Sequence, residues 1–401
     1  MTSAFVVAGP ASGVGKTTVT LGLIQAFRRR GYSVQPFKAG PDYIDPLFHE
    51  AAAGRPSYVL DPWLMGDVRE TFERRAAGAE VAIVEGAMGL YDGPTDAVAR
   101  RLRLPVVLVV DVWAMGASAG ALVRGFRPDA VIFNRVGGPG HYELCRKATR
   151  APVLGWVRND PAFRLPERHL GLALEERTKM PRIEIEADLD ALLRLGRRRM
   201  RPSRERVPAA RGAPAVVGVG RDEAFVFLYP ENLEILEARG ARLDFFSPLR
   251  GEFPRRAQAL YLPGGYPELY RARPHRRLRE AVRAGMPVYA ECGGLMYLVG
   301  QGLLPGRIEM TDRLWNFGYA EAEAARDTLL APRGRRVRGH EYHQSRWRGR
   351  RGPAAWRIGA RLEGYARGNL HASYVHVHFA GAPECAERFV ESARRWGGNL
   401  S

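Results

Sequence analysis

The stretch AFVVAGPASGVGKTT, residues 4–18, decides the fold of the first half of the chain. A short apolar run, Ala4–Ala8, predicts a strand, and glycines lead from it into an amphipathic segment, Thr18–Arg30, that predicts a helix. Glycines in such a loop let backbone N–H groups converge on a phosphate, and the N-terminus of the following helix adds positive potential. The sequence therefore predicts a phosphate-binding loop, with an ordinary glycine-rich turn as the alternative.

The loop departs at one position from the P-loop pattern G-x-x-x-x-G-K-[ST]. That pattern requires glycine where the chain has Pro10, and Gly9 lies one residue further from Gly15. The lysine and threonine that follow are in place to reach the β- and γ-phosphates of ATP and to ligate Mg²⁺. The residues predicted to bind ATP in this loop are Gly13, Val14, Gly15, Lys16, Thr17 and Thr18.

A second cluster follows the next predicted strand. Lys38, Asp42 and Asp45 lie in KAGPDYIDP, residues 38–46. Because ligands of α/β sheets bind at the carboxyl ends of the strands, we expect these side chains near the loop, with Lys38 contacting ATP. A surface turn stabilised by Asp and Pro is the alternative.

Glu85 ends a further apolar run, Val81–Glu85, an arrangement that resembles a Walker B motif. With Thr17 and Asp42 it is predicted to hold Mg²⁺, which prefers carboxylate oxygen beside nucleotide phosphates. A capping or turn acid is the alternative for Glu85. Asn134 ends another run and is predicted to contact the nucleotide, with an ordinary polar loop residue as the alternative.

Apolar runs and helical segments alternate along both halves of the chain, which predicts βαβ units and mainly parallel sheets. The strands predicted in the first half are Ala4–Ala8, Ser33–Phe37, Val81–Glu85, Pro105–Val110, Ala130–Asn134 and Val153–Val157. Those predicted in the second half are Ala215–Val219, Ala241–Phe246, Ala259–Leu262 and Pro287–Ala290, with helices near Glu231–Arg239 and Pro274–Ala284. Residues 196–214 are rich in Arg and Pro without an apolar period and predict a linker. The predicted organisation is one domain over residues 1–195, this linker, and a second domain over residues 215–401.

Cys292 lies in YAECGGLMYL, residues 289–298, where small residues follow an apolar run at an expected strand-to-helix turn. Such a turn exposes a nucleophile and directs a helix N-terminus at it, which stabilises a thiolate that can attack a carbonyl. The N–H groups of Gly293 and of Gly265, in LPGGYPEL, are predicted to bind the resulting oxyanion. His376 is the predicted base. A buried structural cysteine is the alternative for Cys292.

His376 and His378 alternate with valines in SYVHVHF, residues 373–379, so they face the same side of an expected strand. In the absence of Cys292, ordinary strand histidines would be the better interpretation. A metal site formed by this pair has no third ligand at a clear spacing.

The charge of this 401-residue chain is unevenly distributed. The formal net charge is +18, from 61 Lys+Arg against 43 Asp+Glu, and residues 197–211 and 333–351 together carry +13 of it. Lys16 and Lys38 are two of only four lysines, which draws attention to the predicted phosphate site. The arginine stretches lack interleaved aromatic repeats and a helix-turn-helix pattern, so we predict no nucleic-acid partner.

Composition also bears on location. Three cysteines cannot form a disulfide framework, and Cys145 and Cys385 are predicted to be structural, which favours a reducing cytoplasm. The longest apolar run, Leu104–Val110, is far shorter than the ~20 residues of a membrane helix. No secretory signal is visible at the start of the chain. We therefore predict a cytoplasmic protein with no membrane partner.

Taken together, these motifs resemble the cobyrinic acid a,c-diamide synthase family, including its hydrogenobyrinic acid relatives, over nearly the whole chain. The motifs that carry the resemblance are GPASGVGKTT (9–18), KAGPDYIDP (38–46), VEGAMGLYDG (84–93), RHLGL (168–172), FVFLYPENLEIL (225–236), LPGGYPEL (262–269), YAECGGLMYL (289–298), GHEYHQS (339–345) and SYVHVHF (373–379). The resemblance implies an α/β fold. Its N-terminal P-loop domain would be a dethiobiotin synthetase-like parallel sheet, joined to a C-terminal α/β domain similar to class I glutamine amidotransferases.

The resemblance further implies an activity: ATP- and glutamine-dependent amidation of the a and c acetate carboxylates of a corrinoid polycarboxylate through an acyl phosphate, in cobalamin biosynthesis. Cys292 would release ammonia from glutamine, with His376 moving the protons, and ATP and Mg²⁺ would serve the first domain. Contacts with the substrate are predicted at Tyr43, Asp45, His340 and His343. A homodimer is left open.

Two positions depart from wider patterns, and they bear on the alternatives. Partitioning ATPases of the ParA/MinD group carry a signature lysine where this chain has Ala11, and class I amidotransferases place Glu where it has His378. We therefore predict a Cys292–His376 dyad. The alternatives are the same chemistry on another tetrapyrrole such as nickel-sirohydrochlorin, cobyric acid synthase, whose chains are usually longer, and a partitioning-type ATPase with a degenerate amidotransferase domain.

Overall fold

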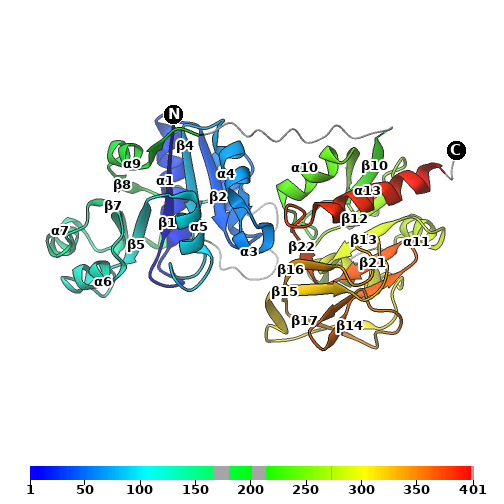
Figure 1. Ribbon diagram of the computed structural model, residues 1–401. Coiled ribbons are helices and arrows are strands. Elements are labelled where there is room, and N and C mark those ends of the chain that lie inside the picture. The colour runs from blue at the N-terminus through cyan, green and yellow to red at the C-terminus, as the bar shows by residue number, and fades with distance from the viewer. Residues whose placement is uncertain (164, 166–179, 201–213, 272, 399–401) are drawn as a thin grey trace. The chain divides into compact units, whose positions relative to one another are not determined.

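The computed structural model in Figure 1 describes residues 1–163, 165, 180–200, 214–271 and 273–398. The chain folds into two compact units, one mainly from each half of the sequence. Much of the predicted linker, residues 201–213, lies outside the described residues, as does the RHLGL motif. No helix within the described ranges is long and apolar enough to cross a membrane.

A mainly parallel sheet forms the centre of the first unit, with the strand order β3-β2-β4-β1-β5-β6-β7-β8. Its strands are β1 (Thr2–Ala8), β2 (Val34–Ala39), β3 (Tyr58–Leu60), β4 (Val81–Glu85), β5 (Val106–Asp111), β6 (Ala130–Val136), β7 (Val153–Arg158), β8 (Ile185–Ala187) and β9 (Arg197–Arg198). β8 pairs antiparallel with β7, and β9 pairs antiparallel with β1. Parallel β4 and β5 flank β1: strands β2 to β4 lie on one side of β1, and the chain then crosses to β5 on the other side. The carboxyl end of β1 is therefore a topological switch point, where such sheets bind ligands.

Helices cover this sheet, which is why its strands are continuous apolar runs rather than alternating ones. The helices of the first half are α1 (Lys16–Arg29), α2 (Asp45–Ala53), α3 (Pro62–Met65), α4 (Val68–Ala76), α5 (Thr95–Leu102), α6 (Ser118–Phe126), α7 (Pro139–Ala148) and α9 (Leu189–Gly196), with a 3-10 turn at Pro161–Phe163. One core cluster joins Val110 of β5 and Phe133 of β6 to Val123 of α6 and Cys145 of α7. This packing fixes the strand ends that carry the predicted nucleotide site.

A second, mainly parallel sheet organises the second unit, with the order β11-β10-β12-β13-β21-β20. Its strands are β10 (Ala215–Gly220), β11 (Ala241–Phe246), β12 (Ala259–Leu262), β13 (Val288–Glu291), β20 (Tyr365–Arg367) and β21 (Leu370–Ser373). The helices are α10 (Pro230–Ala238), α11 (Arg276–Arg283), α12 (Gly293–Gly300) and α13 (Pro383–Gly398), with a 3-10 turn at Pro267–Leu269. Tyr261 and Tyr289 share a core with Phe389 of α13, whereas Val288 packs with Leu295 of α12. Alternate residues of the strands thus face two separate cores.

Antiparallel strands complete the second unit, in a sheet with the order β19-β18-β15-β16-β22 and in the pair β14–β17. They are β14 (Arg307–Met310), β15 (Asn316–Ala324), β16 (Arg336–His343), β17 (Ser345–Arg348), β18 (Trp356–Ile358), β19 (Arg361–Glu363) and β22 (His376–Val377). β22 pairs with β16 so that His376 lies opposite His340. The antiparallel sheet therefore brings two separated histidine motifs together.

The fold class predicted from the sequence is confirmed, and the predicted parallel strands agree with the observed ones apart from small differences at their ends. Apart from the strand expected around His376, the antiparallel strands were not predicted, because many are short and because they are partly exposed and interrupted by Arg and Gly. The predicted linker begins at residue 196, whereas α9 ends at Gly196 and the following two residues form β9. The limits of the two domains otherwise stay predictions.

Candidate active sites

Two glycines in the left-handed region shape the loop between β1 and α1. Gly13 has a φ of 80° and Gly15 a φ of 87°, a conformation that residues with a Cβ rarely adopt. Gly15 also lies against β6, since a Cβ there would be 2.0 Å from Asn134 Nδ2. That Nδ2 donates to the Val14 carbonyl at 3.0 Å. Asn134, predicted to contact the nucleotide, thus supports the loop from a neighbouring strand.

Lys16 and Thr17 begin α1 and are both buried. The Nζ of Lys16 donates to the Ala11 carbonyl at 2.9 Å, so the ammonium lies over the loop. The Oγ1 of Thr17 donates to Glu85 Oε1 at 2.8 Å, which joins the helix to the end of β4. The loop and first turn of α1 therefore combine a cation, a hydroxyl and the N–H groups of a helix N-terminus, as phosphate binding requires.

Lys38 of β2 is the centre of a buried ion cluster. Its Nζ lies 2.6 Å from Asp45 Oδ2, 2.8 Å from Glu85 Oε1 and 3.9 Å from Asp42 Oδ2. Burial alone would lower the pKa of Lys38, but the three carboxylates hold it above its ordinary value. Lys38 is therefore charged and engaged within the protein, and its contact with ATP stays a prediction. Asp45, predicted to contact the substrate, is buried in the same cluster.

Glu85 also accepts contacts from α2, through a residue that the sequence did not reveal. Its Oε2 lies 2.6 Å from His49 Nε2, whose Nδ1 lies 3.1 Å from Ser57 Oγ. Burial would raise the pKa of Glu85, but Lys38 and His49 hold it well below its usual range. The only signal for His49 was its place one helical turn after Asp45.

Asp42 begins the turn that precedes α2. Its Oδ1 accepts the N–H groups of Ile44 at 2.8 Å and of Asp45 at 3.1 Å, so the backbone fixes this carboxylate. With the hydroxyl of Thr17 and the carboxylate of Glu85, it provides the hard oxygen donors that Mg²⁺ prefers. The residues predicted to hold the ion thus have suitable chemistry. Tyr43 lies in the same turn and is buried.

Cys292 lies between β13 and α12 with a φ of 45° and a ψ of −103°. A positive φ is uncommon for any residue with a Cβ and marks local strain that the surroundings must hold. One such restraint is the Cys292 N–H, which donates to the Ser373 carbonyl of β21 at 2.7 Å. The sharp turn from strand to helix matches the nucleophile elbow predicted from the sequence.

Gly293 and Gly265, the predicted oxyanion donors, lie against one another. A Cβ on Gly293 would be 2.8 Å from Gly265 N and 2.7 Å from Gly265 O. Gly265 is equally confined, since a Cβ there would be 1.8 Å from the Ala224 carbonyl. Gly293 is the first residue of α12, so its N–H has no acceptor within the helix. The two backbone segments can therefore present N–H groups to one oxygen atom.

His376 is buried on β22 and interacts with Cys292. Its Nδ1 lies 3.6 Å from Oε2 of Glu291, the last residue of β13. Burial alone would lower the pKa of His376, but the hydrogen bond to Cys292 and the charge of Glu291 raise it to about 10. The predicted nucleophile and base are thus brought together, and Glu291 was not among the predicted residues.

His340 and His378 surround this pair without replacing it. The ring of His340 stacks on that of His376 at 4.9 Å, and its Nε2 lies 2.7 Å from the Tyr229 hydroxyl. Burial, with the charges of the neighbouring histidines, holds the pKa of His340 well below its usual value. Burial lowers the pKa of His378 to about 3. Both rings are therefore neutral near pH 7.

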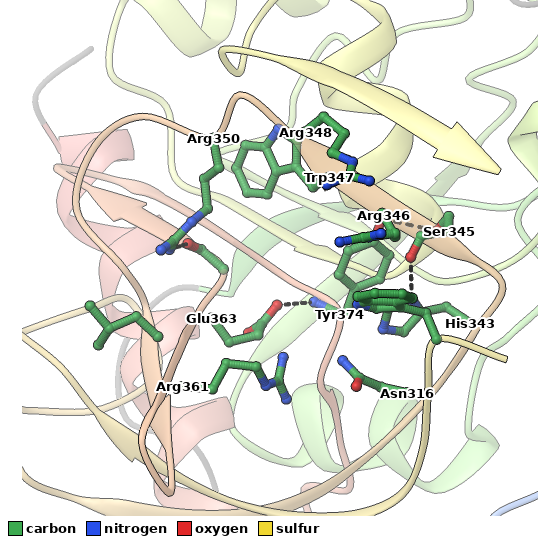
Figure 2. Close-up of a pocket in the computed structure, with 13 residues that line it drawn as sticks. Asn316, His343, Ser345, Arg346, Trp347, Arg348, Arg350, Arg361, Glu363 and Tyr374 are labelled. Atoms are coloured by element: carbon green, nitrogen blue, oxygen red, sulfur yellow. Dashed lines mark hydrogen bonds between the residues drawn. The ribbon is translucent and has the colours of Figure 1, made fainter. Parts of the chain in front are cut away.

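His343, predicted to contact the substrate, lines an open hollow of about 200 Å³ in the second unit (Figure 2). Its ring stacks on Tyr374 at 3.8 Å, and the Tyr374 hydroxyl lies 2.9 Å from Ser345 Oγ. Burial and, to a smaller extent, the charge of Cys292 raise the pKa of Tyr374. The other residues that line the hollow are Trp315, Asn316, Arg346, Trp347, Arg348, Arg350, Arg361, Leu362, Glu363 and Gly364.

Each unit thus contains one chemical site. The first has a phosphate-binding loop beside a buried acid at a neighbouring strand end, and the second has a cysteine–histidine pair beside glycine N–H groups. Together the fold and the sites define a class of protein: a nucleotide-binding domain joined to a glutamine amidotransferase.

Comparison with known proteins gives the same class and narrows it. Residues 5–172 match the CobQ/CobB/MinD/ParA nucleotide binding domain, and residues 216–384 match the CobB/CobQ-like glutamine amidotransferase domain. Cobyrinate a,c-diamide synthase of Salmonella typhimurium is 39% identical, with 98% of each chain covered. The Listeria innocua protein of that name is 36% identical over 97% of this chain and 99% of its own. Hydrogenobyrinate a,c-diamide synthase of Streptomyces coelicolor is 38% identical, with 97% of each chain covered. This chain belongs to the cobyrinate a,c-diamide synthase family, which confirms the resemblance noted in its motifs.

Proposed function

We propose that this protein is an ATP- and glutamine-dependent ligase that amidates the a and c acetate carboxylates of cobyrinic or hydrogenobyrinic acid, in cobalamin biosynthesis. The observation that carries the proposal is the presence, in one chain, of a phosphate-binding loop and of a cysteine–histidine pair with oxyanion donors. The two sites divide the reaction between them. One activates a carboxylate with ATP, and the other supplies the nitrogen from glutamine.

In the second unit, the Cys292 thiolate attacks the side-chain amide carbon of glutamine and forms a C–S bond. The N–H groups of Gly265 and Gly293 stabilise the oxyanion that develops on the amide oxygen. His376 gives a proton to the departing nitrogen, the C–N bond breaks, and ammonia leaves. Water, deprotonated by His376, then hydrolyses the thioester to glutamate and restores the thiol.

In the first unit, a carboxylate oxygen of the substrate attacks the γ-phosphorus of ATP, giving an acyl phosphate and ADP. This activation is needed because a carboxylate is a poor electrophile at neutral pH. Lys16 and the loop N–H groups stabilise the negative charge on the oxygens of the phosphoryl group that is transferred. Binding also aligns the attacking oxygen with the phosphorus. Ammonia then attacks the acyl carbon, phosphate leaves, and the amide remains.

Thr17, Asp42 and Glu85 are the residues proposed to hold Mg²⁺, because they combine one hydroxyl with two fixed carboxylates. The ion, when bound, supplies neutralising charge for the phosphate oxygens. The Lys38 ammonium contacts the carboxylates of both Asp42 and Glu85, and so it keeps these two acids close together beside the loop.

The hollow beside Tyr374 supports glutamine binding at the second site. The guanidinium of Arg346 lies 3.5 Å from the centre of the Trp315 ring, and Arg361 and Glu363 are further lining residues. Arginine suits the α-carboxylate of an amino acid, and Glu363 suits its α-ammonium group. Contacts of the corrinoid with Tyr43, Asp45, His340 and His343 stay predictions from the sequence. A cytoplasmic location rests on the small number of cysteines, and a homodimer is left open.

The test is amidation of cobyrinic and hydrogenobyrinic acid by the purified protein, followed by mass spectrometry, with ATP and either glutamine or ammonium salt. We expect Cys292→Ala to use ammonia as well as the wild type does, but to lose the use of glutamine. Full glutamine-dependent activity in Cys292→Ala would contradict the assigned nucleophile. A preference for nickel-sirohydrochlorin in the same assay would favour the alternative tetrapyrrole over the corrinoids.

A further inference from the structure

The thiol site lacks the carboxylate that class I amidotransferases place two residues after the histidine. Here that position is His378, whose ring packs on Tyr229 with centroids 4.7 Å apart. Burial lowers the pKa of His378 to about 3, so near neutral pH its imidazole has no charge with which to stabilise an imidazolium. The orientation of His376 must therefore come from another part of the fold.

A carboxylate reaches His376 from a different strand. Glu291, the last residue of β13, immediately precedes Cys292, and its Oε2 lies 3.6 Å from His376 Nδ1. Both side chains are only 1 % exposed, so water does not screen the charges. The elbow that positions the nucleophile therefore also fixes the position of this acid.

Three donors hold Glu291 in this place. The Tyr261 hydroxyl donates to Oε2 at 2.8 Å, the Val377 N–H donates to Oε1 at 3.0 Å, and the Tyr289 hydroxyl also donates to Oε1. Tyr261 and Tyr289 are register partners whose rings stack at 5.1 Å, so the two phenols form a rigid support. Burial and then the charge of Glu291 hold the pKa of both phenols well above the usual value, so they stay protonated and donate.

The contact with Val377 has a second effect, because Val377 directly follows His376 on β22. Glu291 thus binds both the ring of the base and the backbone of the strand that carries it. Other titratable groups that face His376 include Cys292 and the stacked ring of His340. Of the three, Glu291 is the acid suited to orient the imidazole and to stabilise its protonated form.

We propose that Glu291 is the third member of the thiol site, a positioning residue that holds Nδ1 of His376 and leaves the other ring nitrogen to serve Cys292. The role matches that of a triad carboxylate, which fixes the tautomer and stabilises the imidazolium without itself being protonated. This inference rests on the proposed glutaminase function, and it replaces the acid expected after the histidine with one that precedes the cysteine.

The test compares Glu291→Gln and Glu291→Asp with the wild type in the full chain, measuring glutamine hydrolysis and ammonia-dependent amidation from pH 6 to pH 10. We expect Glu291→Gln to lower kcat for glutamine on the order of 100-fold with little change in KM. The alkaline limb of its pH profile should move toward neutral pH, because His376 loses the charge that retains its proton. Glu291→Asp should restore part of both losses, and ammonia-dependent amidation should stay unchanged in each variant.

Asp222→Asn is the matched control, because Asp222 is a buried carboxylate that accepts the Ser247 hydroxyl and the N–H groups of Ala224 and Leu249. It should lower stability but leave the alkaline limb in place. A Glu291→Gln protein with wild-type kcat and limb would overturn the inference and leave the proposed function standing. A wild type that releases no ammonia from glutamine would instead overturn the proposed function. If Glu291→Gln does not fold, Glu291→Asp decides, because its shorter side chain withdraws the carboxylate from Nδ1: a wild-type kcat together with an unmoved limb in that variant refutes the inference.

Discussion

Glu85 and Glu291 occupy the same place in two different sheets. Each is the last residue of a central parallel strand, β4 in the first unit and β13 in the second, and each is almost fully buried. Their partners differ in kind. Lys38 and His49 contact Glu85, whereas two phenols, one backbone N–H and the base of the thiol site contact Glu291.

The difference separates two uses of one structural position. A buried carboxylate beside a permanent cation forms a neutralised pair, which fixes its neighbours and resists protonation. A buried carboxylate held by phenols lies where it can stabilise a positive charge that forms on an adjacent imidazole. The strand end determines where the acid lies, and the neighbouring side chains determine what it does.

The comparison predicts the largest effect for Lys38→Met. Removing this ammonium leaves Asp45 and Glu85 buried without their main cation, which should cost about 3–5 kcal/mol of unfolding free energy. Lys147→Met is the matched control, because Lys147 is exposed on α7, and it should change stability by less than about 0.5 kcal/mol. Denaturant titration followed by circular dichroism measures both. Equal stability of the two variants would show that the ion cluster around Lys38 does not stabilise the first unit.

The two carboxylates should also separate in activity. We expect Glu85→Gln to lower both ammonia- and glutamine-dependent amidation by about 100-fold, because it changes the phosphate site that either route needs. Glu291→Gln should lower only the glutamine-dependent route. Parallel rate measurements with the two nitrogen donors test this, and a loss of ammonia-dependent activity in both variants would remove the distinction.

Glu363 is a third buried carboxylate, with neither a lysine nor a phenol among the hydrogen-bond donors described next, and it extends the comparison to stability at different pH values. Glu363 accepts the Ser373 hydroxyl and the Tyr374 N–H, and burial, with the nearby charge of Glu341, raises its pKa to about 7. Because this value exceeds that of the unfolded chain, its stabilising contribution is present below about pH 4.5 and is lost as the pH rises through 7. The wild type should therefore lose about 2 kcal/mol relative to Glu363→Gln between pH 5 and pH 7. Denaturant titrations of both proteins at the two pH values measure it, and parallel pH dependences would contradict it.

The smallest effect is expected at the outer edge of the first cluster. Ser57→Ala removes the hydroxyl that contacts His49 Nδ1, which should cost about 1 kcal/mol of stability. Amidation should change little, because Lys38 and Thr17 still hold Glu85. Thermal unfolding together with the ammonia-dependent rate measures both effects. A clear loss of the ammonia-dependent rate in Ser57→Ala would contradict this expectation and would mean that His49 orients Glu85 for the reaction.

The sequence predicted the parallel sheets and both sites because these features are local. Buried parallel strands are continuous apolar runs, and the glycine loops at residues 9–18 and 289–298 each join a strand to a helix. Side-chain partners between distant segments left weaker signals. His49 is a single histidine on a helix. Glu291 is an acid at the end of a strand, a common position for an acid, and nothing in the sequence distinguishes it from an ordinary one. Only the positions of β22 and β12 relative to β13 reveal what Glu291 contacts.

The antiparallel part of the second unit shows a second kind of feature that could not be predicted from the sequence. β16 pairs with β22 and thereby stacks His340 on His376, although the two histidines are far apart in the chain. Pairing of this kind depends on register between short strands, which local composition does not encode. The motif GHEYHQS marked His340 as a candidate site residue, but it did not indicate that His340 pairs with His376.

The thiol at the elbow also makes this chain suitable for selective chemical labelling. Burial raises the pKa of Cys145, and it raises that of Cys385 to about 12, so both remain protonated thiols inside the protein. Thiolates, and not thiols, react with electrophiles. Cys292 is also buried, but it lies beside His376 and begins the turn into α12, so a small glutamine-like electrophile that enters the site should attach a reporter group there. With that selectivity, the natural sequence would serve as a single-cysteine variant for fluorescence or mass spectrometric studies.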